Sequence, residues 1–201
     1  MTAVLGVPKG KGAPFSKRKL EVLRAAAKLF NVKGFNATSM DDIAKSLNVT
    51  KPALYYYAKS KDEILYQIGS TALREASANL TDINQLNCTG AARLRQFFIV
   101  WTESICLEFG RCLVLVRAEN LEGTSRVKSK RNRRKVHDAV VDIIQAGVED
   151  CSIKPCNPTL TALALFDLFN GIAYWHRPDG ELSATEIAEQ YWQNFAQGFA
   201  K

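Results

Sequence analysis

The chain has 201 residues and an apolar fraction of 47%, enough to fill one large domain or a small domain with a larger companion. It shows neither a basic start followed by an apolar run nor a stretch of roughly eighteen apolar residues, so we expect no secretory signal and no membrane span. Its five cysteines follow no metal-ligand spacing, so we expect reduced thiols in a cytoplasm, no metal and no cofactor.

Positive charge is concentrated in the first sixty residues. These hold eleven Lys and Arg against three acidic residues, a net charge of +8, whereas the whole chain carries +7. The remaining residues, 61–201, therefore sum to −1. This asymmetry is typical of a nucleic-acid-binding module joined to a near-neutral partner. Membrane-surface binding is the competing use of positive charge, but no long basic amphipathic helix accompanies it.

The first fifteen residues are rich in Gly, Pro and Lys, a composition that cannot bury a core. The sequence therefore predicts a flexible basic arm over 1–15, which either lies along a minor groove or does little. After it, apolar positions at steps of three and four predict helices. We expect them over about 17–33, 40–47, 51–57, 61–80, 90–109, 111–118, 125–150, 159–175 and 184–199.

The segment 39–61 predicts a short helix, a tight turn and a second short helix. Ser39 and Asp42 have the spacing of a capping box, in which each residue satisfies a backbone N–H of the other. Thr50 is a good cap for the second helix, and Pro52 falls in its first turn, where a missing N–H costs nothing. The segment therefore has the sequence logic of a helix-turn-helix.

The second of these helices predicts what it touches. Lys51, Pro52, Tyr55 and Tyr56 are related by steps of three and four and share one face, whereas Leu54 points toward the core. A cation and hydroxyls suit phosphates, and ring carbons suit thymine methyl groups, so this face suits a DNA duplex. The alternative is a helical hairpin with surface tyrosines.

A longer motif lies across this region. It runs Gly34-Phe35, Thr38-Ser39, Asp42-Ile43-Ala44, Val49-Thr50-Lys51-Pro52-Ala53-Leu54-Tyr55-Tyr56-Tyr57 and Lys59-Ser60-Lys61-Asp62-Glu63-Ile64-Leu65. In this order it resembles the DNA-binding domain of the TetR family of bacterial transcriptional regulators. The chain departs from that family at Ala58, where a bulky apolar residue, most often Phe, usually stands.

The resemblance implies an all-α homodimer of about nine helices. A helix-turn-helix domain would occupy 16–60, and a ligand-binding and dimerisation domain would occupy 61–201. Two heads would enter successive major grooves of a near-palindromic operator, about 34 Å apart. We assign phosphate contacts to Thr38, Ser39, Thr50, Tyr57 and Lys61, and base-edge contacts to Lys51, Pro52, Tyr55 and Tyr56.

The C-terminal part carries three features that bear on a ligand and on dimer formation. The helix at 90–109 has more aromatic bulk than a helix pair needs, which indicates either core packing or a ligand tunnel. The run 126–135 holds seven cations, which indicates a solvated face or a site for an acidic ligand such as a phosphorylated one. The last two helices are so apolar that they need a cover, and a four-helix bundle with a second protomer supplies one. His137 has no partner evident from sequence, and we treat it as structural.

The segment 175–188 resembles a tail of TetR members that control fatty-acid, sterol or other acyl-CoA breakdown. That resemblance implies a CoA thioester as inducer, although dimer packing would also explain the tail. Our candidate pocket residues are Phe98, Trp101, Arg111, Phe166, Asn170 and Trp175, with Arg111 as the anion contact.

Repression relieved by an inducer is the mechanism that we expect. A drug-like or aromatic inducer, or a ligand-free DNA binder, are the alternatives within this class. An enzyme with a basic arm is the remaining hypothesis, but two histidines and the lack of a Gly-rich phosphate loop argue against it.

Overall fold

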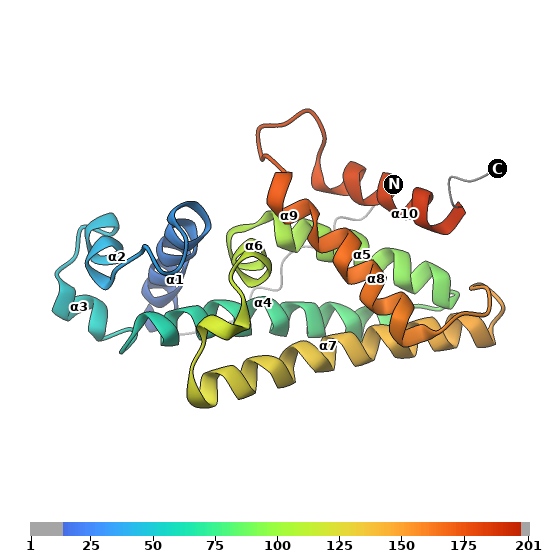
Figure 1. Cartoon of the computed structure of the whole chain (residues 1–201), viewed down its shortest axis with the longest axis horizontal. Coiled ribbons are helices and arrows are strands. Elements are labelled where there is room, and N and C mark those ends of the chain that lie inside the picture. The colour runs from blue at the N-terminus through green and yellow to red at the C-terminus, as the bar shows by residue number, and fades with distance from the viewer. Residues whose placement is uncertain (1–13, 198–201) are drawn as a thin grey trace.

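The computed structural model describes residues 14–197, and within this range every regular element is a helix (Figure 1). The predicted all-α class is confirmed. The elements are α1 (Pro14–Lys33), α2 (Met40–Ser46), α3 (Lys51–Tyr55), α4 (Lys61–Asn84), α5 (Gly90–Cys106), α6 (Glu108–Leu115), the 3-10 helix η1 (Ala118–Asn120), α7 (Gly123–Glu149), α8 (Pro158–Asn170), α9 (Ile172–Trp175) and α10 (Ala184–Gln197).

Several predicted boundaries differ from the structure; α3 ends at Tyr55 and α5 at Cys106, before the predicted ends at 57 and 109. Helix α4 continues to Asn84 because Leu80 and Ile83 are buried and extend its apolar stripe, so the predicted polar hinge shrinks to residues 85–89. The single helix predicted over 159–175 is divided at Gly171 into α8 and α9. Pro14 and Phe15 belong to α1, whereas the rest of the predicted arm, and Phe199 of the last helix, lie outside the described residues.

The buried side chains form two clusters, and α4 belongs to both. Helices α1, α2 and α3 enclose the first cluster, around Phe30, Ile43 and Leu54, together with the first turns of α4 and with buried residues of α6 and the segment after it. Helices α5, α7, α8 and α10 enclose the second cluster with the rest of α4. Figure 1 shows the first group, here called the head, at one end of the long helices that form the body. The head is thus built onto the body through a continuous helix.

Local signals hold the head in shape. The capping box predicted from sequence is present, with the Ser39 hydroxyl accepting from the Asp42 N–H and the Asp42 carboxylate accepting from the Ser39 N–H. Gly34 ends α1 at a φ of +87°, and Asn48 forms the turn between α2 and α3 at a φ of +52°. Both are left-handed conformations, which Gly adopts freely and Asn tolerates. The turn geometry therefore follows from residues that the sequence places there.

The body is packed around α5. A Cβ atom built on Gly90 would lie 2.3 Å from the Gly147 Cα, so α5 and α7 meet there backbone to backbone. Helix α10 is held to α5 by an Arg95–Glu189 ion pair and by the Thr185 hydroxyl, which donates to Glu103 at 2.7 Å. Within residues 14–197, we find no helix that combines the length and apolar character needed to cross a bilayer.

Candidate DNA-binding surface and ligand site

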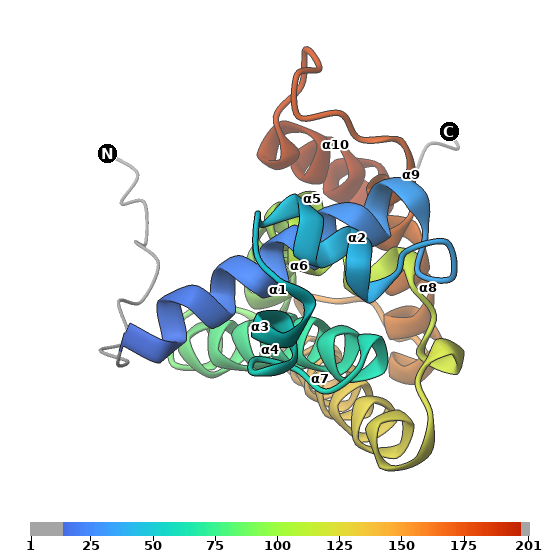
Figure 2. The same ribbon diagram turned by 90° about the vertical axis from the view of Figure 1, so that its left-hand side faces the viewer.

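The predicted reading face of α3 lies on the surface of the head. Lys51 and Pro52 are exposed, and the exposed fractions of Tyr55 and Tyr56 are 44% and 73%. Leu54, the residue directly before Tyr55, is fully buried. Figure 2 looks at this end of the molecule and shows α2 and α3 in front of the long helices. The face predicted from three- and four-residue steps is therefore presented to solvent as one surface.

Lys51 is held across the helix-turn-helix. Its ammonium lies 3.0 Å from the Asp41 carboxylate of α2. This hydrogen bond and the negative charge of Asp41 raise the pKa of Lys51 above its ordinary value. The side chain therefore carries its positive charge at the N-terminus of α3, beside the Asp41 carboxylate.

Three of the residues assigned to phosphates have partners within the head. Thr38 is only 1% exposed, and its hydroxyl donates to the Gly34 carbonyl oxygen at 2.8 Å, so it stabilises the turn after α1 and is not presented to DNA. Ser39 is exposed, but its hydroxyl donates to the Asp42 carboxylate at 2.7 Å. Thr50 is exposed, and its hydroxyl accepts from the Ala53 N–H at 3.4 Å.

The Lys61 ammonium is also bound within the head. It donates to the carbonyl oxygens of Phe35 and Thr38, at 2.6 and 2.8 Å, and lies 4.4 Å from the centre of the Phe35 ring. It therefore closes the α1–α2 turn against α4. Tyr57 is half-buried, and its ring meets that of Tyr56 edge-on at 5.3 Å.

Four of the six candidate ligand residues come together in the body. The ring of Phe166 on α8 lies 5.5 Å from the rings of both Phe98 and Trp101 on α5. The Trp101 indole N–H donates to the Asn170 side-chain oxygen at 3.0 Å. Phe98 and Trp101 are only 1% and 6% exposed. In this structure these residues pack within or against the core, so a ligand could enter among them only by displacing rings.

The other two candidates lie apart from this cluster. Trp175 is half exposed, and its ring packs beside that of Tyr191, with 6.3 Å between the ring centres. Arg111 donates to the His176 carbonyl oxygen at 3.4 Å. Its buried Nε has no hydrogen-bond partner among the described residues.

Two residues of α7 face inward: His137, which the sequence analysis treats as structural, and Arg133, whose burial the sequence analysis did not anticipate. The His137 ring stacks on that of Phe166 at 6.2 Å, and its Nε2 is buried without a partner in the described part of the chain. Arg133, from the basic run, donates to the Leu113 carbonyl oxygen at 2.7 Å, and burial lowers its pKa. His137 and Arg133 stand three and seven residues before the buried Val140, and this spacing places them on the same face of α7, which could have indicated that they face inward.

Two family models match the chain. One, described as "Bacterial regulatory proteins, tetR family", matches residues 22–68, which include the helix-turn-helix. The other, described as "Tetracyclin repressor-like, C-terminal domain", matches residues 87–199, more than half of the chain. The chain belongs to the TetR family. Because this is a family of DNA-binding transcriptional regulators, the expectation that the protein is not an enzyme is confirmed.

Two HTH-type transcriptional regulators resemble the chain over about nine-tenths of their length. YhgD, an HTH-type transcriptional regulator of Bacillus subtilis, is 29% identical over 179 residues, which cover 85% of this chain and 91% of that protein. The HTH-type transcriptional repressor KstR2 of Mycobacterium tuberculosis is 26% identical over 179 residues, covering 88% and 90%.

A solved structure shares both the fold and part of the sequence. The TetR-family regulator PfmR from Thermus thermophilus superposes with a TM-score of 0.81 and is 28% identical, covering 90% of this chain and 99% of that one. The KstR2 structure from M. tuberculosis, at a TM-score of 0.83 and 23% identity, covers 99% and 100% and shows the same fold. The arrangement of head and body is therefore that of TetR-family regulators.

Proposed function

We propose that this protein is a cytoplasmic, homodimeric repressor that binds a near-palindromic operator and leaves it when an acyl-CoA thioester binds the body. The observation that supports DNA reading most directly is the solvent-exposed face of α3, which is formed by Lys51, Pro52, Tyr55 and Tyr56. A repressing role is supported by the likeness to KstR2, which is named a repressor.

The reading face can be tested with a matched pair of variants at Tyr55. Tyr55 is 44% exposed, so Tyr55→Ala removes a ring that contributes little to the head's core. We expect this variant to lose specific operator binding in a fluorescence-anisotropy titration and to remain a dimer. Tyr55→Phe keeps the ring carbons and should retain most of the affinity. Normal binding by the Ala variant would refute the assignment of the face.

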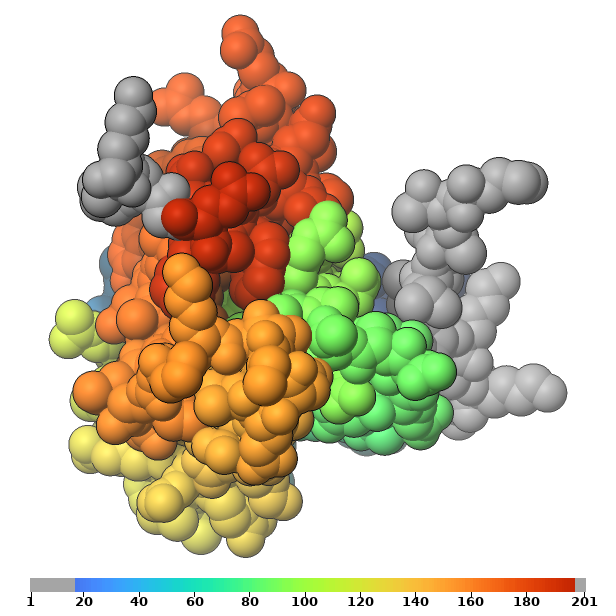
Figure 3. Space-filling view, turned by 90° about the vertical axis from the view of Figure 1, so that its right-hand side faces the viewer, coloured from blue at the N-terminus to red at the C-terminus, as the bar shows by residue number. Residues whose placement is uncertain are grey.

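The dimer surface that we propose lies on α8 and α10. Leu160 and Leu163 of α8 are 63% and 49% exposed, and Phe195 of α10 is 40% exposed. Figure 3 shows the two helices, in orange and red, on the same side of the molecule. Apolar side chains exposed together on two neighbouring helices are the kind of surface that a second protomer covers in a four-helix bundle.

A charge placed in this surface tests the dimer. We expect Leu163→Glu to give monomers in sedimentation-velocity runs at micromolar concentration, because the carboxylate would be buried without a partner. Val127→Glu is the matched control, since Val127 is exposed on α7 outside this surface, and it should remain dimeric. A dimeric Leu163→Glu protein would exclude this interface.

The inducer site that we propose is the aromatic cluster around Phe166. Phe98, Trp101 and Asn170 supply its walls and a polar anchor, and Arg111, which lies outside the cluster, is the residue that we propose for an anionic group once the ligand has opened the site. Support for a CoA thioester comes from the segment 175–188, which resembles a tail of TetR members that control acyl-CoA breakdown. The TetR-fold protein AibR has been crystallised with isovaleryl coenzyme A and operator DNA, and at 23% identity this likeness establishes the fold alone.

An inducer can release the protein from DNA only if it binds the DNA-free conformation more tightly than the DNA-bound one. Since an inducer has to move packed rings, it favours whichever body conformation leaves them apart, and it lowers operator affinity only if that conformation holds the heads at a different spacing. We expect long-chain acyl-CoAs to dissociate the operator complex, whereas free fatty acids and planar drugs should not. Arg111→Met should weaken the acyl-CoA response while leaving operator affinity unchanged. Release by drugs or free acids alone would refute the thioester.

A further inference from the structure

The first half of α7 carries a basic surface that the reading face and the proposed inducer and dimer sites do not use. Helix α7 holds seven Lys and Arg between residues 126 and 135, and one of them, Arg133, turns inward and donates to the Leu113 carbonyl oxygen. The other six are exposed to solvent, and we call them the α7 basic face: Arg126, Lys128, Lys130, Arg131, Arg134 and Lys135.

The charge of this face contrasts with that of the rest of the body. Residues 126–138 carry a net charge of +6, with Asp138 as their one acidic residue, whereas residues 61–201 together sum to −1. The remainder of the body therefore carries −7. Within residues 14–197, one ion pair involves the basic face, between Arg134 and Asp138 at 3.6 Å. The other five cations have no ion pair in that part of the chain, so the face is a positive island on an acidic body.

The packing of α7 keeps these cations close together. Arg131 stands three residues after Lys128 and four residues before Lys135, so these three share one side of the helix. Like charges at this spacing destabilise a helix. The helix is held by its opposite side, where Val136 and Val140 are buried in the body core. An anionic partner on the basic face would relieve a repulsion that the fold itself leaves in place.

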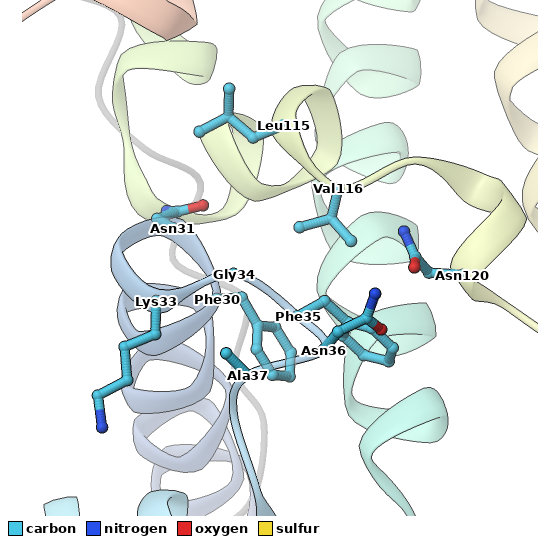
Figure 4. A pocket seen from close by; sticks show the side chains of 10 residues that line it. All are labelled: Phe30, Asn31, Lys33, Gly34, Phe35, Asn36, Ala37, Leu115, Val116 and Asn120. Atoms are coloured by element: carbon cyan, nitrogen blue, oxygen red, sulfur yellow. The ribbon is translucent and has the colours of Figure 1, made fainter.

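The shape of the face fits an extended anion. A hollow of about 380 Å³ lies between the end of α1 and the end of α6 (Figure 4), and none of its lining residues belongs to α7. A second, smaller hollow reaches α7 at Ser129 and Arg133, on the inward side of the helix. The six cations line neither hollow and are spread along about 14 Å of helix. A duplex carries one phosphate charge per roughly 1.7 Å of its axis, so about eight phosphate charges span this length.

Two observations favour DNA over a membrane surface as the partner. The Glu122 N–H donates to the Asp62 carboxylate at 2.9 Å, which fixes the start of α7 beside the start of α4, directly after the helix-turn-helix. Figure 1 accordingly shows the first turns of α7 at the head end of the body. Val127 is the one large apolar side chain exposed between residues 123 and 137, whereas helices that bind a bilayer surface bury an apolar face in it.

We propose that the α7 basic face binds the phosphate backbone of duplex DNA, as a second DNA-contacting surface in addition to the head. The phosphates belong either to the flanks of the duplex that the head holds or to a second duplex beside it. An acidic body with one basic face is attracted to DNA in the orientation that turns this face toward the duplex. The contact adds affinity without reading sequence, because phosphates carry no sequence information. It goes beyond the proposed function and requires no inducer.

A matched pair of double variants tests the face. Lys128→Gln/Arg131→Gln removes one lysine and one arginine from it, and Arg74→Gln/Lys154→Gln removes one of each from exposed positions of the body outside α7. The probe is a mixed-sequence duplex, titrated by fluorescence anisotropy over a series of salt concentrations. Each cation that neutralises a phosphate contributes about 0.9 to the slope of log affinity against log salt concentration.

We expect the α7 variant to lose about 1.8 from this slope for each protomer that places the face on DNA, and the control variant to keep the wild-type slope. An unchanged slope in the α7 variant, or an equal loss in the control, would refute the proposal. Thermal melts establish that both variants are folded. The α7 variant should melt at or above the wild-type temperature, because its substitutions relieve like-charge repulsion.

Two further measurements identify the partner. Vesicles of phosphatidylglycerol probe the competing surface: sedimentation with them that the α7 variant loses, together with an unchanged DNA slope, would replace DNA by a membrane and refute the proposal. For the source of the phosphates, protein bound to an immobilised mixed-sequence duplex is offered a second, labelled duplex. Capture by the wild type that the α7 variant lacks assigns the face to a second duplex, and a reduced slope without such capture assigns it to the flanks of the first. Because the probes contain no operator, these outcomes are independent of the residues assigned to the reading face.

Discussion

Replacing Lys61 by Met separates two roles that this lysine could have. In the structure its ammonium donates to the Phe35 and Thr38 carbonyl oxygens at 2.6 and 2.8 Å. Hydrogen bonds to a charged group contribute about 1.5–3 kcal/mol each, and this side chain is partly exposed, which reduces their value. We therefore expect Lys61→Met to lower the free energy of unfolding by about 2 kcal/mol, measured by urea denaturation. Lys59→Met, at an exposed neighbour, should change it by less than about 0.5 kcal/mol.

The salt dependence of operator binding supplies the second measurement. A lysine that neutralises a phosphate contributes about 0.9 to the slope of log affinity against log salt concentration. If Lys61 serves the α1–α2 turn, Lys61→Met weakens operator binding at every salt concentration and leaves that slope unchanged. A slope reduced by about one unit, together with unchanged stability, would show that Lys61 leaves its carbonyl partners for a phosphate and that the structural role is wrong.

Two further predictions concern stability. Hydrogen bonds from the serines that cap their helices lower the pKa of Asp42 and Glu186 below 3.8 and 4.5, so their contribution is complete above these values and is lost as the pH falls through the folded pKa values. Urea unfolding should show a decline in stability below about pH 4 that is smaller in an Asp42→Asn/Glu186→Gln variant; an identical decline would contradict this. Gly90→Ala places a Cβ 2.3 Å from the Gly147 Cα and should cost about 3 kcal/mol or more, whereas Gly69→Ala, whose Cβ would be 3.4 Å from a flexible leucine methyl, should be neutral or stabilising in thermal melts.

The parts of the head that could be predicted from the sequence depend on short-range spacing. The Ser39–Asp42 capping box and the buried Leu54 beside the exposed Tyr55 each involve residues within one helical turn, and the structure has both. The hydrogen-bond partners of Thr38 and Lys61 could not be predicted from the sequence, because they are set by how the chain folds back. Lys61 reaches a carbonyl oxygen 26 positions away, and no local pattern records that contact.

The body shows the same limit at longer range. Spacings of three and four residues predict that Phe98 and Trp101 share a face of α5 and that Phe166 and Asn170 share a face of α8. In the structure these two faces meet. Trp175 is half exposed and lies beyond the break at Gly171, where the sequence predicted one continuous helix. Aromatic composition alone also could not distinguish a packed core from a tunnel.

That ambiguity has a physical consequence for the proposed inducer site. Phe166 contacts Phe98, Trp101 and His137 from α8, the helix that also exposes Leu163 to the proposed partner protomer. Since the rings are in contact, an inducer gains its space by moving Phe166, and the backbone of α8 is the element that can move with it. Under the proposed function, entry of a ligand among these rings would therefore act on the same helix as the proposed dimer surface, and this shared helix is the route by which we expect a change among the rings to alter the distance between two heads.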